Sequence, residues 1–253
     1  LCVAGVACCV AMSMPQVHIV AYCTDLGFGA ARGAEMLSLM LASGIVSRLV
    51  FGVISDRIGG IRTLLLGSFL QGLALLMFLP FDGMVPLYLV SAMFGLFQGG
   101  IVPAYAIIVR EHFNPQEAGA RVGAVIMATL LGMALGGWMS GKVFDLTGSY
   151  TAAFVNGLLW NLVNLSVVLW LLLLALMTLG ETGLTAAAFE AVSALSTVGL
   201  STGVTTAEGS PTRIILIMLM FIGRLGPVVL VAAIVLRTRP NLYRFPTESP
   251  LIG

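Results

Sequence analysis

Long apolar stretches constrain this chain more than any other feature. An apolar helix of about 20 residues crosses the hydrocarbon core of a bilayer, and several stretches of that length precede residue 180. There are six of them, at approximately residues 1–24, 33–54, 62–80, 85–109, 119–141 and 150–178. Because lipid offers no hydrogen-bond partners to the backbone, each stretch is predicted to be helical. The sequence therefore predicts an all-α, polytopic membrane helix bundle.

Composition supports a membrane protein and argues against several other classes. Of the 253 residues, 59% are hydrophobic and only 9% are charged, which no soluble domain of this size would tolerate on its surface. The net charge of +1 gives no indication of a nucleic-acid partner, so membrane lipid is the expected surrounding. The four cysteines lack metal-site spacing, and no group of side chains suggests catalysis. We expect neither a metal, nor a cofactor, nor an enzyme.

Basic residues between the spans predict the orientation. The second and fourth connections carry Arg57, Arg62, Arg110 and Arg121, whereas the first, third and fifth offer only two basic residues together. Loops rich in Arg and Lys stay in the cytoplasm. The second and fourth connections and the amino end are therefore predicted to be cytoplasmic.

Small residues at four-residue spacing predict close helix packing, because glycine lets two backbones approach in the bilayer. The pairs are Gly95 with Gly99, Gly119 with Gly123, Gly132 with Gly136, and Gly137 with Gly141.

The stretch GVISDRIGGIR, residues 52–62, joins an acidic helix end, two glycines that permit a reversal, and flanking arginines. Such charges can hold two helices together in one state and release them in another. The stretch resembles the cytoplasmic loop motif of the major facilitator superfamily, in its carboxyl-terminal six-helix half. The resemblance implies a gating role for these residues: Gly52, Asp56, Arg57, Gly59 and Arg62.

Two further stretches extend this resemblance over residues 1–172. SRLVFGVISDR, residues 47–57, and GGWMSGKVFDLTGSY, residues 136–150, look like helices eight and eleven of the monocarboxylate and oxalate/formate branch. The six spans would then be helices seven to twelve. The resemblance implies transport of a small mono- or dicarboxylate with proton coupling, and a missing amino-terminal half that transport would require.

Arg48 is the first candidate substrate-binding residue, because an arginine within a span is costly without a partner. The resemblance implies that a carboxylate substrate is this partner, whereas the alternative is an arginine that snorkels to the interface. His18 and Tyr22 in the first span are further substrate-binding candidates. They either line a cavity or couple protons, or are hydrogen-bonded within the bundle.

The pattern changes after the sixth span. Residues 184–196 are apolar but too short to cross the membrane, which predicts a re-entrant pore helix. The stretch STVGLSTG at 196–203 follows, and its glycines permit the backbone angles that aim carbonyl groups at an ion. One more span is predicted at 212–236.

These carboxyl-terminal residues resemble the last pore repeat of the Trk/Ktr family of potassium uptake proteins. The resemblance rests on FEAVSALSTVGLSTGVT, on GSPTRIILIMLMFIGRLGPVVL and on LYRFPTESPLIG. It implies a K⁺ filter strand at Thr197, Val198, Gly199 and Leu200, with Arg224 along the ion path. A complete filter would need the other pore repeats.

The two resemblances predict two parts, residues 1–172 and 173–253, that oppose each other in orientation. The sixth span would end in the cytoplasm in the first family, whereas the pore repeat needs a span that ends outside. The chain also opens inside an apolar run, as a fragment would. We hypothesise a chimera of two truncated genes, joined within WLLLLALMTLGE at residues 170–181.

Three functional interpretations stay open: a carboxylate transporter fragment, a potassium uptake subunit fragment, and a non-functional product. The expected location is the inner (plasma) membrane of a bacterium.

Overall fold

The computed structural model describes residues 1–178, 184–203 and 210–235, and these ranges contain helices and loops but no strand. The helices are α1 (Cys2–Asp25), α2 (Ala30–Ile58), α3 (Gly60–Met77), α4 (Met84–Gln98), α5 (Ile101–His112), α6 (Pro115–Thr147), α7 (Tyr150–Thr178), α8 (Leu184–Leu195) and α10 (Ser210–Val235). Within the described part, six spans are long and apolar enough to cross a membrane, with α4 and α5 counted as one. The predicted all-α fold and the six membrane spans predicted before residue 180 are confirmed.

Glycine and capping residues set the ends of the helices. Gly59 alone separates α2 from α3, with φ 84° and ψ 162°, a conformation that is essentially restricted to glycine. Asn114 caps α6, since its side chain accepts a hydrogen bond from the Gln116 amide and Pro115 takes the first helical position. Gly148 ends α6 in the left-handed conformation.

The fourth span differs from the prediction, which placed one uninterrupted helix at 85–109. The structure breaks it at Gly99 and Gly100, between α4 and α5. Pro103 explains the break, because its ring excludes a normal helical bond to the carbonyl group four residues earlier, at Gly99.

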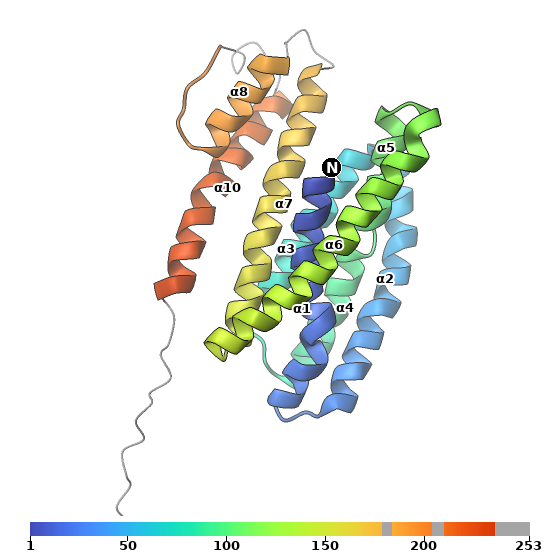
Figure 1. Ribbon diagram of the computed structural model, residues 1–253, viewed down its shortest axis with the longest axis vertical. Coiled ribbons are helices and arrows are strands. Elements are labelled where there is room, and N and C mark those ends of the chain that lie inside the picture. Colours follow the sequence, from blue (N-terminus) through green and yellow to red (C-terminus); the bar gives the residue numbers. More distant parts are fainter. Residues whose placement is uncertain (179–183, 204–209, 236–253) are drawn as a thin grey trace, which may run out of the picture.

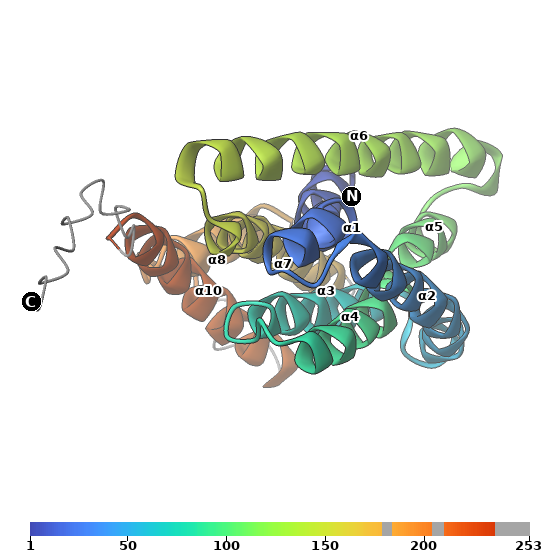
Figure 2. The ribbon, with the colours of Figure 1, turned by 90° about the horizontal axis from the view of Figure 1, so that it is seen from below.

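Helix α1 lies inside the bundle, where it packs against α6, α7 and α2. Figure 1 shows α6 crossing α1 obliquely, and Figure 2 shows α6 along one side of the bundle with α3 and α4 on the other. Helix α2 packs mainly on α4, and α3 on α7, α5 and α4. Only about a sixth of the best membrane window of α2 is buried, so most of this helix faces outward.

The described side chains form two separate hydrophobic clusters. The larger one joins the helices from α1 to α7 and includes Met14, Phe78 and Tyr105. The smaller one joins the carboxyl half of α7 to α8 and α10, through side chains such as Leu173 and Leu219.

The connections lie at two ends of the bundle (Figure 1). We call one the basic end, because the α2–α3 and α5–α6 connections bring Arg57, Arg62, Arg110 and Arg121 there. Helix α7 also ends at the basic end, and α8 and α10 both begin beside it. Helix α10 therefore runs from the basic end toward the opposite end.

Candidate functional site

Arg48 lies on the outward face of α2. It is four residues from Gly44, the midpoint of the helix, which corresponds to about 6 Å along the axis. Its side chain is exposed, whereas the preceding Ser47 is buried against α4. No residue that the structure describes forms an ion pair with Arg48. The guanidinium group is thus available to an anion on this face.

His18 and Tyr22 lie one turn apart on α1 and both have partners inside the bundle. The His18 imidazole Nε2 is 3.0 Å from the Gly137 carbonyl oxygen of α6. The Tyr22 ring packs on Tyr150, with centroids 4.9 Å apart, and against the edge of Phe154. These two residues therefore join α1 to α6 and α7, and no hydrogen bond among the described residues links them to Arg48.

The predicted gating loop contains the tight reversal but, in the described part of the chain, no charge pairs. Asp56, Arg57 and Arg62 are exposed and form no ion pair there. Gly52 has open space above it, since a Cβ there would meet nothing within 4 Å. Gly59 makes the turn, as predicted from the sequence.

Glu111 at the end of α5 contributes to this loop and was missed from the sequence. The Gly60 amide donates to both carboxylate oxygens of Glu111, at 3.1 and 3.2 Å. A carboxylate at a helix amino terminus satisfies an otherwise unpaired N–H group and interacts favourably with the helix dipole. Gly60 is required for this approach, because a Cβ would lie 2.8 Å from Ile108 and 3.0 Å from Glu111. Glu111 therefore ties the start of α3 to α5 at the basic end.

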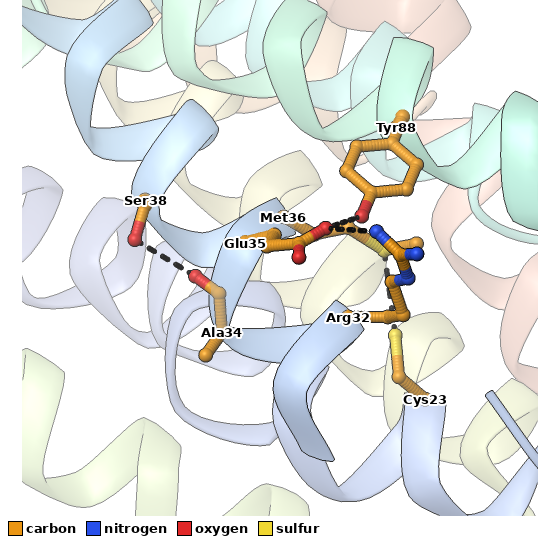
Figure 3. A network of polar contacts seen from close by, with 7 residues as sticks. All are labelled: Cys23, Arg32, Ala34, Glu35, Met36, Ser38 and Tyr88. Carbon is orange, nitrogen blue, oxygen red and sulfur yellow. Dashed lines mark hydrogen bonds and ion pairs between the residues drawn. The ribbon is translucent and has the colours of Figure 1, made fainter. Parts of the chain in front are cut away.

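A second polar contact, also missed, joins α2 to α4 at the opposite end (Figure 3). Arg32 donates to Glu35 at 2.8 Å, and the Tyr88 hydroxyl donates to the same carboxylate oxygen. The i,i+3 spacing of Arg32 and Glu35 was a visible signal in the sequence. About half of each charged side chain is exposed, so the Arg32–Glu35 pair within α2 stabilises the fold little, and the Tyr88 hydrogen bond is the contact that joins α2 to α4.

The filter-like segment at 196–203 follows α8 as a turn and an irregular loop. Thr197, Gly199 and Gly203 have positive φ values of 55°, 78° and 88°. The Leu200 carbonyl oxygen accepts a hydrogen bond of 2.6 Å from the Ser193 hydroxyl. The side chains of Val198 and Leu200 are each 60% exposed.

Glu190 of α8 holds the carboxyl-terminal end of this segment in place, a role that was not predicted from the sequence. Its buried carboxylate accepts hydrogen bonds from the Ser201 hydroxyl at 2.6 Å and the Thr202 amide at 2.8 Å. Buried charged groups need such hydrogen bonds to offset lost hydration.

Gly223 lets α10 touch the end of α8, since a Cβ there would overlap the Leu195 carbonyl. The adjacent Arg224 is exposed, and no described residue pairs with it.

The fold and these residues define a multi-pass membrane protein of the transporter type. The model of the Major Facilitator Superfamily matches residues 1–231, and the chain belongs to this superfamily. The matched region extends beyond residue 172, where the sequence predicted the end of the facilitator-type part.

Curated relatives of two kinds match the chain. Monocarboxylate transporter 13 of Rattus norvegicus is 31% identical over 144 residues, which cover 56% of this chain and 34% of the relative. Monocarboxylate transporter 12-B of Danio rerio is 29% identical over 154 residues, covering 56% of the chain and 31% of the relative. Ktr system potassium uptake protein B of Vibrio alginolyticus is 42% identical over 65 residues, or 26% of the chain and 14% of the relative. The chain thus spans about a third of the monocarboxylate transporters and a smaller part of the potassium uptake protein.

Proposed function

We propose that this chain serves transmembrane transport of a small mono- or dicarboxylate, coupled to protons. The single observation that carries the proposal is Arg48, an exposed guanidinium that pairs with no described residue and lies about 6 Å from the middle of a membrane helix. Charged groups at this depth are costly and face cavities or partners. The names of the relatives, monocarboxylate transporters 13 and 12-B, favour a carboxylate as the partner.

The proposed mechanism needs a second six-helix half, because alternating access requires two halves that rock around a site near the midplane. We propose that this half packs against the outward face of α2, which is mostly unburied and carries Arg48. His18 and Tyr22 would contribute to substrate binding from α1, and the loop from Gly52 to Arg62 would gate access between the two halves. The proposed location is the plasma membrane, or the inner membrane of a bacterium.

Uptake of labelled small carboxylates by whole cells that also express the second six-helix half tests this proposal. The Arg48→Gln variant should lower uptake about tenfold or more, because it leaves the carboxylate of the bound substrate without its charged partner. Arg121→Gln is a matched control, since Arg121 pairs with Glu117 on an exposed helix face. Equal uptake by Arg48→Gln and Arg121→Gln would refute a substrate role for Arg48.

A second candidate function is potassium uptake, and the segment 196–203 favours it. Three positive φ angles in seven residues give the irregular backbone that an ion filter uses, and the match to the potassium uptake protein supports this candidate. Thr197, Val198, Gly199 and Leu200 would be the filter residues, with Arg224 along the path. The hydrogen bond from Ser193 weakens the case, because it occupies the Leu200 carbonyl that should face K⁺. If this candidate is right, the chain should restore growth of cells that lack their own potassium uptake, and Gly199→Ala should abolish this effect.

The third candidate is a chimeric product without transport activity. Two observations support a boundary near residue 172: the second hydrophobic cluster, and the start of α8 and α10 at the same end at which α7 finishes (Figure 1). With the basic end in the cytoplasm, α10 would run outward, against the orientation of a potassium pore repeat. The arginines at 237, 239 and 244 that bear on this conflict lie outside the described residues. Long-read sequencing across codons 165–185 tests whether the chain is a chimera. An intact reading frame in independent isolates would exclude a chimera.

A further inference from the structure

His18 of α1 lies well inside a membrane span, whereas the other histidine of the chain, His112, is the last residue of α5. Seven residues separate His18 from Asp25 at the end of α1, which corresponds to about 10 Å along the helix axis. Helix α1 finishes at the end of the bundle opposite the basic end. With the basic end in the cytoplasm, His18 is therefore nearer the outer surface of the membrane.

Proton-coupled transport needs a group within the spans that gains and loses a proton near neutral pH. Histidine ordinarily does so between about pH 5 and 8, whereas thiols and phenols ordinarily titrate at about 8.5 and 10. The carboxylates in the six described spans all lie within five residues of a helix end, and they are Asp25, Glu35, Asp56, Glu111, Glu117 and Asp145. The deepest of them, Glu35, pairs with Arg32. Among the described spans, His18 is thus the group that fits this requirement.

The hydrogen bond of His18 determines which ring nitrogen can take up a proton. Nε2 lies 3.0 Å from the Gly137 carbonyl oxygen, and a carbonyl oxygen only accepts, so Nε2 carries the hydrogen of the neutral ring. The lone pair is then on Nδ1, for which no described residue is a hydrogen-bond partner. A proton added at Nδ1 leaves the bond to Gly137 in place and makes it charge-assisted. His18 can therefore change its charge without releasing α1 from α6.

The surroundings of His18 leave the ring accessible and without a fixed counter-charge. The side chain is only partly buried, and Gly141 of α6 leaves room beside it, since a Cβ there would lie 3.6 Å from the ring. No ion pair among the described residues includes His18. The titratable or charged groups nearest this end on α1 and on the helices packed against it are Tyr22, Cys23 and Asp25 of α1, Arg32 and Glu35 of α2, Lys142 and Asp145 of α6, and Tyr150 of α7. The Arg32 and Glu35 side chains pair with each other, and Asp25 accepts a hydrogen bond from Tyr150 at 3.0 Å.

We propose that His18 carries the coupled proton, an inference that rests on the proposed carboxylate transport. Nδ1 takes a proton from water on the outer side, and the imidazolium ion returns it to water on the inner side, which restores the neutral ring. One proton crosses with one monocarboxylate, so the cycle moves no net charge. A charged ring inside the bundle is costly without a counter-charge, and the carboxylate held at Arg48 supplies one only while it is bound. Proton and substrate therefore favour each other's binding.

Uptake of labelled lactate by whole cells that also express the second six-helix half tests the proposal, with uptake by cells without this chain subtracted. Acidifying the outside by about one pH unit should raise the initial rate of the wild type about three- to tenfold, since the proton concentration rises tenfold. His18→Gln should lose this acceleration, because its amide can still donate to the Gly137 carbonyl but cannot take up a proton. Exchange of labelled for unlabelled lactate at equal pH should be retained, because exchange moves no net proton.

His112→Gln is the matched control, since it makes the same chemical change at an exposed ring that bonds to the Ile108 carbonyl oxygen at 3.1 Å, and it should keep the acceleration. Equal acceleration of the wild type and His18→Gln would overturn the role of His18 and leave carboxylate transport standing. Loss of exchange in His18→Gln would assign the residue to substrate binding alone and overturn the proposal. No lactate uptake by the wild type would instead refute the proposed function itself.

NMR titration of the full chain with labelled histidine measures the protonation of His18 independently of transport, and the His112→Gln variant assigns its signal. We expect the His18 ring to gain a proton between about pH 5 and 8 and to carry the hydrogen of its neutral form on Nε2. A ring that stays neutral down to about pH 5 would overturn the proposal.

Discussion

Replacing Gly132 of α6 with alanine tests the contact that holds α6 against α1. A Cβ at Gly132 would lie 2.6 Å from the Val6 carbonyl oxygen and 2.9 Å from the Val6 Cα. Real Cβ atoms essentially never come within 3.0 Å of such atoms, so the helices must separate by at least 0.4 Å, the difference between 3.0 and 2.6 Å. Both obstructing atoms belong to backbone, so no side-chain rotation relieves the overlap.

Gly123 on the same helix is the matched control, because a Cβ there would meet nothing within 4 Å. Both substitutions gain helix propensity, about 1 kcal/mol for alanine over glycine, so this gain cancels between the two variants. The remaining difference is the overpacking cost, about 1–3 kcal/mol for an added carbon in a closely packed interface. Gly132→Ala should therefore have a free energy of unfolding lower than that of Gly123→Ala by this amount.

Reversible unfolding by SDS in mixed micelles measures both variants under the same conditions. A difference below about 0.5 kcal/mol would mean that α6 does not approach α1 as closely as the structure shows, and the packing argument for the pair Gly132 and Gly136 would fail.

Three further substitutions probe the ends of the helices by the same unfolding measurement. Gly59→Ala should cost about 1–3 kcal/mol, because the α2–α3 turn uses a conformation that alanine strains to adopt; a neutral result would contradict that turn. Glu111→Ala should cost about 0.5–2 kcal/mol through loss of the cap on Gly60, and more than Glu117→Ala, whose ion pair is exposed; equal costs would argue against the cap. Asn114→Ala should cost about 1 kcal/mol by removing the side-chain cap of α6, and stability unchanged within about 0.3 kcal/mol would exclude this capping role.

The helices could be predicted from the sequence because lipid restricts spanning segments to long apolar helices. The break in the fourth span was also predictable in principle, since Pro103 stands four residues after Gly99. Close packing was predicted for four glycine pairs alike. Gly95, Gly99, Gly132 and Gly136 do lie against backbone of a neighbouring helix, and Gly137 and Gly141 make ordinary contacts, but Gly119 and Gly123 face open space.

The polar contacts between helices could not be predicted, because they join residues far apart in the sequence. Glu111 and Gly60 are 51 positions apart, and Asn161 and Gln71 are 90 positions apart. No local pattern gives the angle between α3 and its neighbours that brings these groups together. The roles proposed for Arg48, His18 and Tyr22 rested on residue type and depth, and the structure adds where each side chain lies.

Whole-cell uptake that compares labelled small carboxylates with labelled rubidium is the most direct test of the proposed function. In cells that also express the second six-helix half, we predict carboxylate uptake above that of cells without this chain, lost in Arg48→Gln and retained in Arg121→Gln, without rubidium uptake. Rubidium uptake that Gly199→Ala abolishes, with no carboxylate uptake at all, would contradict the account.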